Sequence, residues 1–201
     1  MQEQRRINKS LYTPQLEKDS CGTGLIAMLN GEKTHEVIEN ALTMLTNMEH
    51  RGACGCEPNT GDGAGILMQT PHEFFQRKCK EMNVDLPEFG KYGVGMVFFP
   101  KNKNLMSQCR VLFNDYIDEL GFELLGYRKV PTDAEGLGES AISVEPRIEQ
   151  VFVQPKEKLD VKTLERRLHV LRKFAIHNIH RTFPQTEDHF YLCSFSYKTI
   201  V

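Results

Sequence analysis

Short apolar runs alternate with amphipathic stretches along most of this chain, and this alternation restricts its fold class more than any other feature. A continuous apolar run such as residues 93–99 is typical of a buried strand, whereas apolar residues spaced three or four apart predict a helix. Helices are predicted over residues 34–48, 72–83 and 105–120 and from residue 161 onwards. Strands are predicted over residues 21–29, 93–99, 122–130, 151–153 and 191–201, and residues 60–69 are predicted to be a loop that runs into a further strand, with another loop at 131–146. This order of elements predicts an α/β or α+β protein whose sheets are covered by helices.

The ends of three helices carry local signals. Thr70 is predicted to cap the helix that follows it, with Pro71 in the first turn and Glu73 three residues on. Asp160 is predicted to cap the last long helix through its carboxylate. Gly121 stands where the helix before it should end.

Charge and hydropathy exclude several classes of partner. The chain has 25 basic and 27 acidic residues, so its net charge of −2 gives no electrostatic reason to expect nucleic acid or an anionic membrane. Its first ten residues are polar, unlike a secretory signal, and its apolar stretches are far shorter than the ~20 residues that span a bilayer. We therefore expect a cytoplasmic protein.

Neither the cysteines nor the histidines have the spacing of a metal site. The chain has six cysteines, at positions 21, 54, 56, 79, 109 and 193, which we expect to be reduced thiols. Cys54 and Cys56 are separated by one residue and lack the two-residue gap of zinc sites. His177 and His180 lie on a helix with no third ligand evident on the same face. No metal is expected in this chain.

Cys21 is the candidate nucleophile. Two glycines follow it closely, which leaves its sulfur uncrowded, but a free thiol with a pKa of about 8.5 is mostly protonated at neutral pH. If residues 1–20 were removed as a leader, the new α-amino group, with a pKa of about 7.7–8.0, could take the thiol proton. On composition alone, a buried structural cysteine remains the alternative.

The His50-Arg51-Gly52 element is the second candidate. Arg51 offers five donors suited to a carboxylate or to holding a neighbouring loop, although a surface turn is an equal alternative. His50 is an alternative base for Cys21, in the manner of cysteine proteases, but the α-amino group makes it unnecessary.

Gly61, Asp62 and Gly63 belong to a glycine-rich loop that runs into a strand. The loop lacks the Gly-Lys-Ser/Thr ending of a phosphate-binding loop and the repeated ligands of a calcium loop. The glycines instead indicate a sharp bend of the backbone close to the active site, with Asp62 hydrogen-bonded within the turn.

Several of these motifs together resemble a known family. CGTGLIAML, NMEHRGACGCEPNTGDGAGILMQTPHEFF, LGESA, EPRIEQVFV and FYLCSFSYKTIV are similar to the amino-terminal amidotransferase domain of glutamate synthases, over residues 18–201. The resemblance implies the α+β class, with the four-layer αββα sandwich of N-terminal nucleophile hydrolases, incomplete in this chain. It also implies a leader at residues 1–20, the first part of a class II glutamine amidotransferase domain at residues 21–201, Cys21 as nucleophile, and active-site support from Arg51, Gly52, Gly61, Asp62 and Gly63.

The resemblance also implies a reaction. L-Glutamine would be hydrolysed through a cysteinyl thioester to glutamate and ammonia, and the ammonia would convert 2-oxoglutarate to glutamate elsewhere in the enzyme. FMN and an iron–sulfur cluster would belong to the remaining domains of the large subunit. A small electron-donating subunit is a further partner that the resemblance allows, and the choice of electron donor among NADPH, NADH and ferredoxin stays open. An Asn-Gly oxyanion pair and the residues that grip glutamine are expected after residue 201, so the chain alone is predicted to be inactive.

Two alternatives stay open. The chain could belong to another class II amidotransferase, of the phosphoribosyl-amine or glucosamine-phosphate type, although the TGDGAGIL and EPRIEQVFV stretches disfavour it. It could also be a non-catalytic module that keeps the fold.

Overall fold

The computed structural model describes residues 22–49, 57, 59–61, 63–187 and 189–201. The chain divides into two compact units, a smaller one of residues 1–55 and 61–64 and a larger one of residues 56–60 and 65–201. Each unit is described by itself.

The smaller unit contains helix α2, His35–Asn47, which confirms the helix predicted at 34–48. The strand predicted at 21–29 is wrong, because residues 22–28 have no regular secondary structure, and Leu25 and Leu29 are almost fully exposed. An apolar run forms a strand only where a neighbouring strand can pair with it, and the regular element among the described residues of this unit is the helix α2. The turn predicted at Asn30 and Gly31 is present, and Gly31 has a φ of +73°.

A four-stranded antiparallel sheet organises the larger unit, with strand order β3-β4-β2-β5. The strands are β2 (Gly93–Phe99), β3 (Phe122–Lys129), β4 (Arg147–Pro155) and β5 (Tyr191–Ser196). A second sheet pairs β1 (Met68–Gln69) with β6 (Thr199–Ile200). The helices are α3 (His72–Glu81), α4 (Lys103–Glu119), α5 (Glu139–Ser143) and α6 (Val161–Thr182), followed by the 3₁₀ turn Pro184–Thr186.

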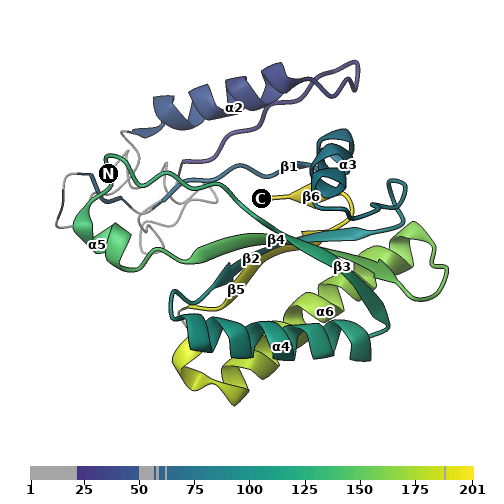
Figure 1. The fold of residues 1–201 in the computed structure, drawn as a ribbon. Helices are drawn as coiled ribbons and strands as arrows, with labels where there is room; N and C mark the ends of the chain where they lie inside the picture. The colour runs from purple at the N-terminus through teal and green to yellow at the C-terminus, as the bar shows by residue number, and fades with distance from the viewer. Residues whose placement is uncertain (1–21, 50–56, 58, 62, 188) are drawn as a thin grey trace, which may run out of the picture. The chain divides into compact units, whose positions relative to one another are not determined.

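The four-stranded sheet is packed on both faces (Figure 1). Helices α4 and α6 cover one face, where Val151 and Val153 of β4 meet their buried apolar residues. Phe152 points to the other face and packs with Phe75 and Cys79 of α3. This alternation along β4 is what a strand buried on both sides requires.

The signals at helix and strand ends were only partly predictive. Asp160 caps α6 as predicted, since its carboxylate accepts from the backbone nitrogens of Lys162 and Thr163 at 3.0 and 3.1 Å. Thr70 does not cap α3, which contradicts the prediction. Its own N–H donates to the carbonyl of Lys198 at 2.8 Å, so Thr70 extends the β1–β6 pairing and its hydroxyl is buried without a hydrogen-bond partner.

The carboxyl-terminal stretch forms two strands, not the single strand predicted. Ser196 ends β5, and its hydroxyl oxygen accepts from the N–H groups of Lys198 and Thr199 at 2.9 and 3.3 Å. These bonds close a turn that sends β6 into the second sheet. The loop predicted at 131–146 also differs, because it contains the one short helix α5.

Candidate active site

The described residues include only part of the predicted site. Cys21, Arg51, Gly52 and Asp62 lie outside them, as do His50, Cys54 and Cys56. Gly61 and Gly63 are described and exposed, and Gly63 has a φ of +86°. That φ lies in the left-handed region that favours glycine, in agreement with the sharp bend predicted here. The role of the bend at an active site stays a prediction.

The segment that directly follows Cys21 lies against α2. A Cβ atom placed on Gly24 would be 2.2 Å from the sulfur of Met44, far inside any normal contact. Glycine at position 24 therefore lets the backbone approach the helix closely. Gly22 and Thr23, which lie between Cys21 and this contact, are both exposed.

The described thiols are poor nucleophiles. Cys79 and Cys109 are fully buried, and burial raises the pKa of each thiol to about 11. Burial also raises the pKa of Cys193. A thiol with a raised pKa stays protonated at neutral pH, and it is the thiolate that attacks carbonyl groups. These three cysteines are therefore structural.

Glu57 forms a cluster of hydrogen bonds that the sequence did not reveal. Its carboxylate accepts from the hydroxyls of Ser140 at 2.6 Å and Thr60 at 2.7 Å, and from the N–H of Ser140 at 3.3 Å. These bonds hold the pKa of Glu57 below its ordinary value, and the bond from the Ser140 hydroxyl has the largest effect. The turn-forming composition of residues 57–60 was the available signal, but it does not indicate the partner 83 residues away.

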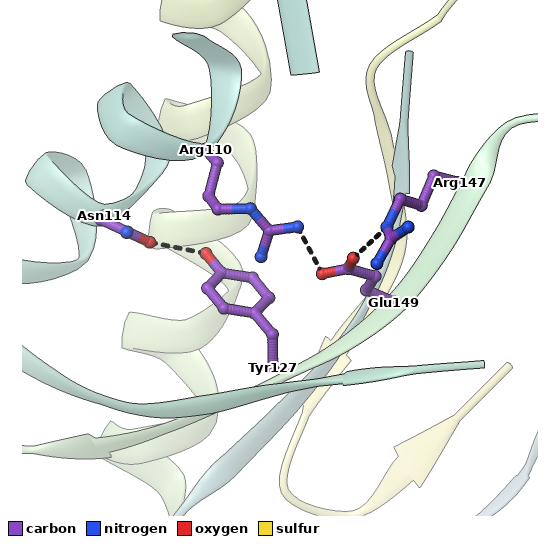
Figure 2. A network of polar contacts seen from close by, with 5 residues as sticks. All are labelled: Arg110, Asn114, Tyr127, Arg147 and Glu149. Atoms are coloured by element: carbon purple, nitrogen blue, oxygen red, sulfur yellow. Dashed lines mark hydrogen bonds and ion pairs between the residues drawn. The ribbon is translucent and has the colours of Figure 1, made fainter. Parts of the chain in front are cut away.

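A second polar network lies between α4 and β4 (Figure 2). Arg110 and Arg147 each donate to a different oxygen of Glu149, at 2.7 and 2.6 Å. Beside them, the hydroxyl of Tyr127 donates to Asn114 at 2.7 Å, and burial raises the pKa of Tyr127. Both carboxylate oxygens of Glu149 are occupied by guanidinium groups, so this network is better suited to holding α4 on the sheet than to proton transfer.

A hollow with a volume of about 710 Å³ lies beside β5 and α6 in the larger unit. Basic side chains of α6, Arg166, His169 and Arg172, contribute to its wall. Gly61 and Gly63, the two predicted site residues that the structure describes, do not line this hollow.

The described part of the chain offers no metal centre. It contains no group of three or more His, Cys, Asp or Glu side chains arranged to hold a metal ion. His180 of α6 has Nε2 at 2.9 Å from the carbonyl oxygen of Phe190. Within the same residues, no helix has the length and apolar character needed to cross a membrane.

Comparison with known proteins assigns the family. The model of the class II glutamine amidotransferases matches residues 21–201. The chain belongs to the class II glutamine amidotransferases. Among relatives of this amidotransferase domain, the glutamate synthase [NADPH] large chain of Bacillus subtilis is 40% identical over 195 residues, which cover 96% of this chain and 12% of the relative.

Two further relatives are also glutamate synthases. The glutamate synthase [NADH] of Saccharomyces cerevisiae is 40% identical over 204 residues, or 96% of this chain and 9% of the relative. The ferredoxin-dependent glutamate synthase of Pyropia yezoensis is 36% identical over 194 residues, or 96% of this chain and 12% of the relative. The chain is thus homologous to the amino-terminal part of glutamate synthases and spans about a tenth of their length.

Proposed function

We propose that this chain is the first part of the glutaminase domain of a glutamate synthase large subunit, with Cys21 as its nucleophile. The observation that carries the proposal is the family match over residues 21–201, which begins at the candidate nucleophile. Glutamate synthases align with 96% of the chain at 40% identity, which supports this enzyme over other class II amidotransferases.

The chemistry requires a thiolate and a base. The Cys21 sulfur attacks the side-chain amide carbon of L-glutamine, the C–N bond breaks, and the leaving nitrogen takes a proton and departs as ammonia. Water then attacks the γ-glutamyl thioester, which releases glutamate and restores the thiol. Removal of residues 1–20 would place an α-amino group on the same residue, where it can accept and return the thiol proton. The raised pKa values of Cys79 and Cys109 favour Cys21 over these buried thiols.

The remaining predicted site residues would support the nucleophile. Arg51 and Gly52 hold the site, and Gly61, Asp62 and Gly63 bend the backbone beside it. In the complete domain, the sheet covered by α4 and α6 would supply two layers of a four-layer αββα sandwich.

The rest of the large subunit would use the ammonia to convert 2-oxoglutarate to glutamate in the cytoplasm. FMN and an iron–sulfur cluster would reside in those other domains, with no cofactor in this chain. A small electron-donating subunit is a further partner in this proposal. The relatives are NADPH-, NADH- and ferredoxin-dependent enzymes, so the electron donor stays open.

The test compares two nitrogen sources in the complete enzyme. Cys21→Ala should abolish glutamate formation from glutamine and retain formation from added ammonia, because only ammonia release needs the sulfur. Cys193→Ala is the matched control, since its thiol is half-buried and lies 3.8 Å from the Met96 carbonyl oxygen. Full glutamine-dependent activity in Cys21→Ala would refute the proposal, and ammonia transfer to a sugar phosphate would indicate a different class II amidotransferase.

A further inference from the structure

The turn at residues 57–60 is tied to a distant segment at residues 136–140. The Ser140 hydroxyl and N–H both donate to the Glu57 carboxylate, and the Asn59 side-chain amide donates to the Gly136 carbonyl oxygen at 2.9 Å. The Thr60 hydroxyl donates to the same carboxylate and closes the turn on itself. Bonds that join residues about 80 positions apart fix the path of the chain in a way that local turn geometry alone does not.

The contact between these two segments leaves no room for a side chain at position 138. A Cβ atom placed on Gly138 would lie 2.0 Å from a carboxylate oxygen of Glu57 and 2.2 Å from the hydroxyl oxygen of Thr60. An alanine at position 138 would therefore force the Glu57 carboxylate and the Thr60 hydroxyl to move away. The contact depends both on the hydrogen-bonding groups and on the missing side chain opposite them.

The place of this turn in the chain gives the contact its significance. Residues 50–56, which include Arg51, precede the turn, and the Gly61–Gly63 bend follows it directly. The turn belongs to the larger unit, whereas the neighbouring residues up to Gly55 and over Gly61–Ala64 belong to the smaller one. The Glu57 contact thus fixes, within the larger unit, the turn that lies between these two stretches in the sequence.

We propose that Glu57 and Ser140 are positioning residues for the glutaminase reaction, which fix the turn from which the Arg51-bearing stretch and the Gly61–Gly63 bend extend. This inference rests on the proposed function. Neither residue needs to touch glutamine, because a small misplacement of supporting backbone is sufficient to slow a reaction that depends on orientation. A 1 Å misplacement can cost up to about 100-fold in rate.

Three variants of the complete enzyme test the contact from different sides. Ser140→Ala removes the donor hydroxyl, and Gly138→Ala pushes Glu57 away without removing a polar group. Ser140→Thr keeps a hydroxyl and should rescue the first variant. Ser143→Ala is the matched control, because Ser143 is also on α5 but its hydroxyl donates to the Ser140 carbonyl oxygen, not to Glu57.

Ser140→Ala and Gly138→Ala should each lower kcat for glutamine hydrolysis about tenfold, with a smaller change in KM. In both variants, glutamate formation from added ammonia should stay within about twofold of the wild type, because that reaction bypasses the glutaminase site. Ser140→Thr and Ser143→Ala should stay within about twofold of the wild type in both activities. Hydrogen exchange at residues 57–65 should be faster in the two impaired variants, a readout independent of activity.

Unchanged glutamine kcat in Ser140→Ala and Gly138→Ala would overturn the inference. So would an equal loss of the glutamine- and ammonia-dependent activities, since that pattern means general destabilisation. Failure of the proposed function itself has a different signature: the wild type would then release no ammonia from glutamine, or Cys21→Ala would release it normally.

Discussion

Arg110 on α4 and Glu149 on β4 form an ion pair of 2.7 Å in which the carboxylate side is only 3% exposed. The guanidinium also stacks over the rings of Tyr127 and Phe99, with its central carbon 4.4 and 4.8 Å from their centroids. Arg147, the second partner of Glu149, is 44% exposed. The two arginines therefore share a carboxylate but differ in how much they contribute to packing.

This difference predicts unequal costs of removal. Arg110→Ala should lower the free energy of unfolding by about 2–4 kcal/mol, because it leaves a buried carboxylate with one exposed partner and removes the stacking. Arg147→Ala should cost about 1 kcal/mol or less. Urea denaturation of the 201-residue chain measures both. Equal costs would show that burial does not decide the strength of these two contacts.

The close approach of Gly24 to Met44 predicts a coupled pair of substitutions. Gly24→Ala should destabilise α2 by about 1 kcal/mol, a modest cost because the methionine side chain can move aside. In a Met44→Ala background the same change should be nearly neutral. Hydrogen exchange of the α2 amides provides the measurement, and an equal effect of Gly24→Ala in both backgrounds would contradict the observed contact.

The buried thiol of Cys109 predicts a loss of stability at alkaline pH. Its folded pKa of about 11 is above the ordinary value of 9.0, so the folded state holds the proton more tightly than the unfolded state. The resulting stability is complete below pH 9 and is lost as the pH rises toward 11, by about 1 kcal/mol at pH 10. Unfolding curves of wild type and Cys109→Ala at pH 8 and pH 10 should differ by this amount in their pH dependence. Identical pH dependence in the two proteins would refute it.

The proposed catalytic base predicts the start of the mature chain. A free α-amino group on Cys21 requires the loss of residues 1–20, so the intact mass of the active complete enzyme should correspond to a first residue of Cys21. A fully active enzyme that retains Met1 would exclude the α-amino group as the base.

The sequence predicted elements well where side-chain periodicity decides them. Helices α4 and α6 and strands β2 and β3 lie within a few residues of their predicted positions, because each places apolar side chains on a face that meets the core. Periodicity does not report hydrogen-bond partners. The apolar run at 21–29 therefore suggested a strand, the turn after Ser196 was missed, and Thr70 was assigned to a helix cap although it pairs with Lys198.

The same limit applies to the candidate site, where local motifs were predicted and contacts between distant segments were not. The motif residues were found from their chemistry and from resemblance to a family, and the family assignment was confirmed. Glu57 and Ser140 both lie in stretches that resemble the family, but their contact was not predicted, because it joins segments 83 residues apart. Gly138 was visible as one residue of the LGESA stretch in a predicted loop, and the lack of room for a side chain there appears only once Glu57 lies opposite it.

The central claim, that Cys21 attacks the amide of glutamine, is tested most directly by covalent capture. A glutamine analogue with an electrophilic diazoketone in place of its amide should alkylate the complete enzyme once per active site, and peptide mass analysis should locate the adduct on Cys21. Excess glutamine should prevent the labelling, and Cys21→Ala should remain unlabelled. An adduct on Cys54, Cys56 or any other residue, or labelling of Cys21→Ala at the wild-type level, would contradict the account.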